Sequence, residues 1–117
     1  MTPDSIKASY RRMMNAVGET VTIRRYTGSG ANRPRFDVEV MARVTEYDPR
    51  ELVGAIVQGD RKLIILAEDM IAAQVPPDIR KGDKAVVRGK ELNIEAADDN
   101  TRRVQGVLIA YELQVRG

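Results

Sequence analysis

Two residue types that carry much of enzyme chemistry are missing from this chain, which has no histidine and no cysteine among its 117 residues. A Ser–His–Asp triad would have no imidazole base, and a thiol nucleophile, a disulfide and a Cys/His zinc site are all excluded. The acidic pair Glu68-Asp69 has no further ligand at a telling spacing, and Asp98-Asp99-Asn100 lacks the later Gly and Glu of an EF-hand loop. We therefore expect no catalytic residue, no metal site and no cofactor.

The glycine-containing stretch Thr27–Pro34 shares only its glycines with a phosphate-binding loop. The Lys-Ser/Thr pair that would hold the β- and γ-phosphates of a nucleotide is absent, so the composition favours the tip of a β-hairpin. Arg33 and Arg35 lie at the end of this stretch. These two arginines are our candidate contact with a neighbouring protein ring or with DNA in a channel.

Residues 3–17 are predicted to form an amphipathic helix. Thr2 is a hydroxyl N-cap, and Pro3 occupies the first helical position, where proline is favoured. One apolar stripe is formed by Ile6, Tyr10, Met13 and Val17. Three basic residues lie away from this stripe: Lys7, Arg11 and Arg12. So few charges are typical of a solvated outer face rather than of a membrane-binding or phosphate-binding helix.

The rest of the chain, residues 19–117, has the alternating pattern of β-strands. The longest run is Val104–Val115, in which every second residue is apolar: Val107, Ile109, Tyr111, Leu113 and Val115. The middle of this run is apolar on both faces, which predicts a central strand covered on two sides. The stretch Phe36–Val44 alternates as well, and it predicts a strand with one face in water.

About seven strands at short spacing and one N-terminal α-helix predict a mainly β fold, a small antiparallel β-barrel or sandwich in a single domain, 1–117. The longest apolar run, Leu63–Ala67, is too short to span a bilayer, so we expect a soluble protein that is made in the cytoplasm and binds no membrane. The net charge is only +2, and the aromatic residues are one Phe and four Tyr. A domain that binds nucleic acid tightly is usually more basic.

A series of turn and core residues carries a resemblance: Gln58-Gly59-Asp60, Leu63-Ile64-Ile65-Leu66, Lys81-Gly82-Asp83, Gly89, Ile94, Ile109-Ala110-Tyr111 and Val115-Arg116-Gly117. In this order they resemble small neck proteins of tailed phages and prophages, the head–tail joining proteins, also called stopper or head-completion proteins. The resemblance covers residues 54–117 and does not include the opening helix.

Such a family implies a small β-barrel without enzymatic activity that forms a homo-oligomeric ring beneath the portal. The ring would keep packaged DNA in the head, contact portal or adaptor proteins on one side and tail proteins on the other, and let DNA pass without sequence-specific binding. The protein would be in the host cytoplasm during assembly and in the virion neck afterwards. The alternative is a small OB- or SH3-like barrel that binds nucleic acid, which would present aromatic and basic residues on one face.

Overall fold

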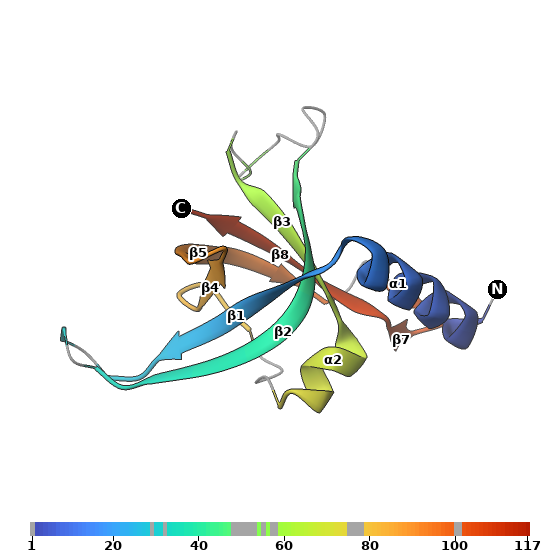
Figure 1. Cartoon of the computed structure of the whole chain (residues 1–117), viewed down its shortest axis with the longest axis horizontal. Helices are drawn as coiled ribbons and strands as arrows, with labels where there is room; N and C mark the ends of the chain where they lie inside the picture. Colours follow the sequence, from blue (N-terminus) through green and yellow to red (C-terminus); the bar gives the residue numbers. More distant parts are fainter. Residues whose placement is uncertain are drawn as a thin grey trace.

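The computed structural model describes residues 2–28, 30–31, 33–47, 54, 56, 59–74, 79–99 and 102–117. Within them, six strands form a closed antiparallel barrel in the order β1-β2-β3-β8-β5-β4 (Figure 1). The barrel strands are β1 (Glu19–Tyr26), β2 (Arg35–Glu46), β3 (Arg61–Leu66), β4 (Lys84–Val87), β5 (Lys90–Asp98) and β8 (Ala110–Arg116). The other elements are α1 (Pro3–Val17), α2 (Ala67–Ala72), β6 (Arg103–Val104) and β7 (Val107–Leu108). The predicted mainly β fold with an N-terminal helix is confirmed, as a barrel rather than a sandwich.

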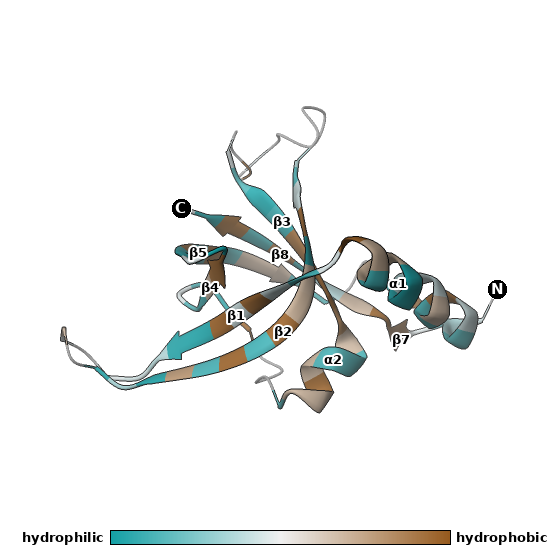
Figure 2. Cartoon of the chain, in the orientation of Figure 1, coloured by the Kyte–Doolittle hydropathy of each residue, from teal (hydrophilic) through white to brown (hydrophobic). Residues whose placement is uncertain are grey.

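Aliphatic side chains fill the inside of the barrel. They come from alternate positions of the strands, among them Val21, Ile23, Val40, Ala42, Leu63, Ile65, Leu92, Ile94, Leu113 and Val115. Met70 of α2 joins this core, so the short helix that follows β3 packs against the barrel interior. Figure 2 shows hydrophilic residues at the outer end of β1 and at the start of β3, where these strands leave the core.

Helix α1 packs on the outside of the barrel, over a second apolar cluster that contains Met14, Ile64, Leu66 and Ala110. Its predicted bounds and its N-cap are confirmed, because the Thr2 hydroxyl accepts a hydrogen bond of 3.2 Å from the Ser5 backbone N–H. The predicted stripe is wrong at its end: Val17 is 51% exposed, whereas Met14 is 1% exposed. The buried face therefore combines Met13 and Met14, and the last turn of the helix extends beyond it.

The predicted long final strand is interrupted. Gln105 and Gly106 both have positive φ, 51° and 80°, and they turn the chain back so that β6 and β7 form a small separate hairpin. Val107, which was expected in the core, lies in this hairpin and is 38% exposed. Ile109 is buried as expected. β8 pairs with β3 along one edge and with β5 along the other, as every strand of the closed barrel has two strand neighbours.

Residues 19–117 contain the helix α2 and the β6–β7 hairpin besides the barrel strands. A shift of register between Ile94 and Ala96 in β5 leaves Ile94 buried and Ala96 exposed, although they are two positions apart. Asp60, directly before β3, is buried and accepts hydrogen bonds from Gln114 at 2.8 Å and from Arg116 at 2.8 and 2.9 Å. The segment 52–58, whose sequence pattern does not decide between a helix and a strand, lies outside the described residues except for Gly54 and Ile56.

Candidate functional site

Arg33 and Arg35 both lie at the outer end of the β1–β2 hairpin, which extends beyond the barrel (Figure 1). The hairpin projects because the neighbouring strands pair with only part of β1 and β2. β4 pairs with β1 only at Thr22–Arg24, and β3 pairs with β2 only from Arg43 onward. In the described part of the chain, the outer ends of β1 and β2 therefore have only each other as strand neighbours. The loop reverses with glycines at positive φ, at Gly28 and Gly30.

The structure brings the two predicted arginines together around Tyr26. The guanidinium carbon of Arg33 lies 4.1 Å from the centre of the Tyr26 ring, a cation–π contact. Arg35 belongs to β2 rather than to the loop, and it is the register partner of Tyr26. Its Nε lies 3.4 Å from Oδ2 of Asp37. Both arginines are exposed, so their charges face solvent at the tip of the hairpin.

One face of the hairpin base is bound to β5 by a network of ionic hydrogen bonds. Arg24 donates to both carboxylate oxygens of Asp37, at 2.9 and 3.0 Å, and to Oε2 of Glu91 at 2.8 Å. The Tyr26 hydroxyl donates to the same oxygen of Glu91, also at 2.8 Å. The hydrogen bonds from Arg24 lower the pKa of Asp37, and those from Tyr26 and then Arg24 lower the pKa of Glu91.

The opposite face of the hairpin base is bound to the turn before β4. Arg25 donates to the two carboxylate oxygens of Asp83 at 2.9 and 2.7 Å, and the Arg80 backbone N–H donates to Asp83 at 3.1 Å. Asp83 is buried, so this pair is largely removed from water. Phe36 is the register partner of Arg25 and remains 46% exposed. Because both faces of its base are bonded, the hairpin has a fixed direction relative to the barrel.

These contacts leave an exposed basic tip on a hairpin whose base is bonded to the barrel. Four arginines and one carboxylate occur between Arg24 and Asp37. The two arginines at the base each bond both oxygens of a carboxylate, whereas Arg35 has a longer ion pair of 3.4 Å with Asp37 and Arg33 lies over the Tyr26 ring. Among the described residues, no group of three or more His, Cys, Asp and Glu side chains could hold a metal ion. The search for membrane spans in the same residues found no helix long and apolar enough to cross a bilayer.

Sequence reasoning placed Arg33 and Arg35 in the hairpin but missed the residues that orient it. Glu91 and Asp83 are separated from their arginine partners by 67 and 58 positions, and no local pattern links them. Fold and site together define the protein as a small closed β-barrel with a projecting basic hairpin. Comparison with protein-family models and with curated proteins found no match to the chain.

Lowering the pH is expected to loosen the hairpin base. Asp37 and Glu91 have pKa values below their ordinary 3.8 and 4.5, so their ionic bonds add stability above those values and lose it as the pH falls through the lowered pKa values. The amide chemical shifts of Arg24 and Tyr26, followed by NMR, should therefore change below about pH 4. Asp37→Asn should remove part of this change, and Asp4→Asn on α1 should not. Identical titrations of the wild type and Asp37→Asn would contradict the assignment.

Proposed function

We propose that this protein is a non-enzymatic structural component of the neck of a tailed phage or prophage, where copies of it form a ring that joins the DNA-filled head to the tail. The observation that carries the proposal is the hairpin that projects from a closed barrel and is bonded on both faces of its base. Closure of the barrel pairs the strand edges within one subunit. The hairpin is then the element that reaches a neighbouring molecule.

The residues that carry the sequence resemblance support the neck proposal, because they lie in the core and in the turns of the barrel. Leu63, Ile65 and Ile94 are in the barrel core, and Gly82 and Gly89 have positive φ in the turns on either side of β4. The resemblance therefore follows the framework of the barrel. It does not include the hairpin, whose role is argued from its contacts alone.

In the proposed ring, each subunit meets its neighbour through different surfaces on its two sides, as closed cyclic assemblies do. Portal or adaptor proteins contact one side of the ring and tail proteins the other. Arg33 and Arg35 face the adjacent ring or the DNA in the channel, where guanidinium groups would contact phosphates without reading bases. The protein is made in the host cytoplasm and ends in the virion neck.

The proposal is tested by binding to heads. The purified protein, which should sediment as a monomer or a weak oligomer alone, is mixed with portal-bearing heads that lack it and with complete particles. Co-sedimentation with the incomplete heads, and not with particles whose neck is already filled, is the expected result. Equal binding to both, or to neither, would contradict the proposal.

One observation favours the nucleic-acid-binding alternative, because Tyr26 and Phe36 lie close to arginines at the hairpin tip. The register weakens it: Tyr26 pairs with Arg35, whereas Phe36 pairs with Arg25, so the two aromatic rings project from opposite faces of the hairpin. A platform for stacked bases needs aromatic faces side by side. Tight binding of single-stranded DNA that weakens steeply with salt would favour the alternative over the neck.

A further inference from the structure

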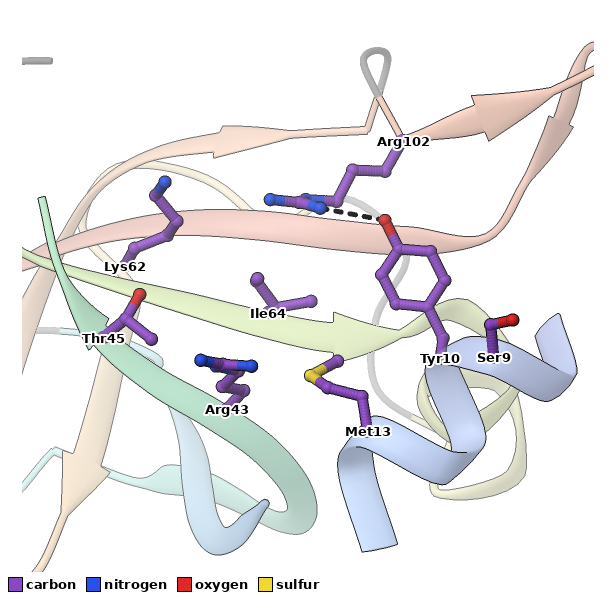
Figure 3. Close-up of a pocket in the computed structure, with 8 residues that line it drawn as sticks. All are labelled: Ser9, Tyr10, Met13, Arg43, Thr45, Lys62, Ile64 and Arg102. Atoms are coloured by element: carbon purple, nitrogen blue, oxygen red, sulfur yellow. Dashed lines mark hydrogen bonds between the residues drawn. The ribbon is translucent and has the colours of Figure 1, made fainter. Parts of the chain in front are cut away.

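A groove lies beside α1 on the outer surface of β2 and β3 (Figure 3). Its volume is about 400 Å³. Met13 and Ile64 form an apolar floor, where the surface covered by α1 continues into solvent. Arg43 is the register partner of Ile64, and Thr45 is the register partner of Lys62, so the two strands line the groove side by side.

The groove is positively charged. Its lining includes three cations, Arg43, Lys62 and Arg102, and no carboxylate. Arg102 is bonded to Glu112 at 2.7 Å and to the Tyr10 hydroxyl at 2.9 Å. The Arg43 side chain, by contrast, has no hydrogen bond or ion pair with any residue in the described part of the chain. The group that complements this groove is a carboxylate next to a large apolar side chain.

Helix α2 presents that combination on the surface of the same chain. Ile71 is 79% exposed, more than any other large apolar side chain among the described residues. Glu68 precedes it by three positions, so the two side chains lie on one side of the helix. Glu68 is bonded to Arg11 at 2.7 Å and is still about half exposed. Figure 1 places α2 beyond the end of β3, whereas Lys62 and Ile64 of the groove lie in the strand itself.

We propose that Ile71 and Glu68 of one copy dock in the groove of a second copy, with Ile71 on the floor formed by Met13 and Ile64 and with Glu68 beside Arg43. This inference rests on the proposed ring and names one of its contacts. The docking residues of α2 and the groove are different surfaces of one chain. The contact is therefore heterologous and can close a ring. One side chain in one groove buries far less area than a stable interface, so copies associate weakly until a template holds them together.

Cysteine cross-linking tests the contact, because the natural chain has no cysteine. Ala72→Cys protein, which keeps Ile71 and Glu68 and carries the thiol at the exposed neighbouring position of α2, is mixed with Thr45→Cys protein in a glutathione redox buffer, and the mixed disulfide is measured. The matched control is Ala72→Cys mixed with Lys81→Cys, a highly exposed position on the turn before β4. Docking should raise the yield of the mixed disulfide about tenfold over that control, through the higher effective concentration of the two thiols.

Reversing the charges of Arg43 and Glu68 in the same assay shows whether the disulfide forms through specific docking or through random collisions. Adding Arg43→Glu to the Thr45→Cys protein should lower the yield about tenfold, and adding Glu68→Arg to the Ala72→Cys protein should restore it. Yields equal to the control, or yields indifferent to Arg43→Glu, would overturn the inference. If cross-linking fails although particles lacking the protein lose their DNA, the docking is wrong and the neck role stands. If cross-linking succeeds although particles without the protein are complete, the neck role is wrong and the docking stands.

Discussion

Arg33→Ala combined with Arg35→Ala is expected to lower the yield of infectious particles about a hundredfold while the protein still folds. Both side chains are exposed at the hairpin tip, and their removal leaves the Arg24–Asp37 and Arg25–Asp83 bonds at the base intact. Exposed substitutions of this kind usually change stability by less than about 0.5 kcal/mol. The functional loss is larger because each weakened contact recurs in every subunit of the ring.

The measurement is a plaque titre from complementation of a phage that lacks the gene, together with a thermal unfolding curve of the purified variant. Arg12→Ala combined with Lys81→Ala is the matched control, since it removes two exposed positive charges outside the hairpin. An equal fall in titre with the control would show that total charge matters and the hairpin does not. A large fall in the unfolding temperature of the hairpin variant would also contradict the account.

Ile109→Ala is expected to lower the free energy of unfolding by about 2–5 kcal/mol, the range for truncating a packed core side chain. Val107→Ala should change it by less than about 0.5 kcal/mol. The two residues are two positions apart and share one face in the sequence pattern, but Ile109 is 2% exposed and Val107 is 38% exposed. Each substitution removes apolar volume from a β-branched residue, so they form a matched pair.

Urea unfolding of the two variants decides between an interrupted and a continuous final strand. A continuous strand would bury both residues, and both substitutions would then be costly. Similar large losses for Ile109→Ala and Val107→Ala would contradict the separate β6–β7 hairpin. A small loss for both would place this whole segment on the surface.

Local chemistry predicted those features that depend on neighbouring residues. Thr2 and Pro3 begin α1 because capping and the fixed φ of proline act within one turn of helix. The alternation of Leu113 and Val115 predicted a buried face because side chains of a strand point to opposite sides in turn. The glycine-containing loop before Arg33 predicted a hairpin, and β1 and β2 are paired on either side of it.

Features that depend on distant residues could not be predicted in the same way. Arg11 was expected on a solvated helix face, yet it binds Asp69 at 2.6 Å, because β3 and α2 bring that carboxylate next to α1. The projection of the hairpin depends on where β3 and β4 stop pairing with β2 and β1, and the local pattern of the hairpin does not contain that register. The burial of Met14 could not be predicted from the helical spacing of apolar residues. The packing of α1 against the barrel, and not the helix alone, determines which of its residues are covered.

The most direct test of the neck role is the deletion of the gene from a phage or inducible prophage that carries it, followed by electron microscopy and DNA quantification of the particles. The account predicts assembled tails that remain separate from heads, and heads that package DNA and then lose it. Expression of the wild-type chain in trans should restore joined particles. Complete, infectious particles from the deletion strain, or a defect confined to replication or transcription, would contradict the account.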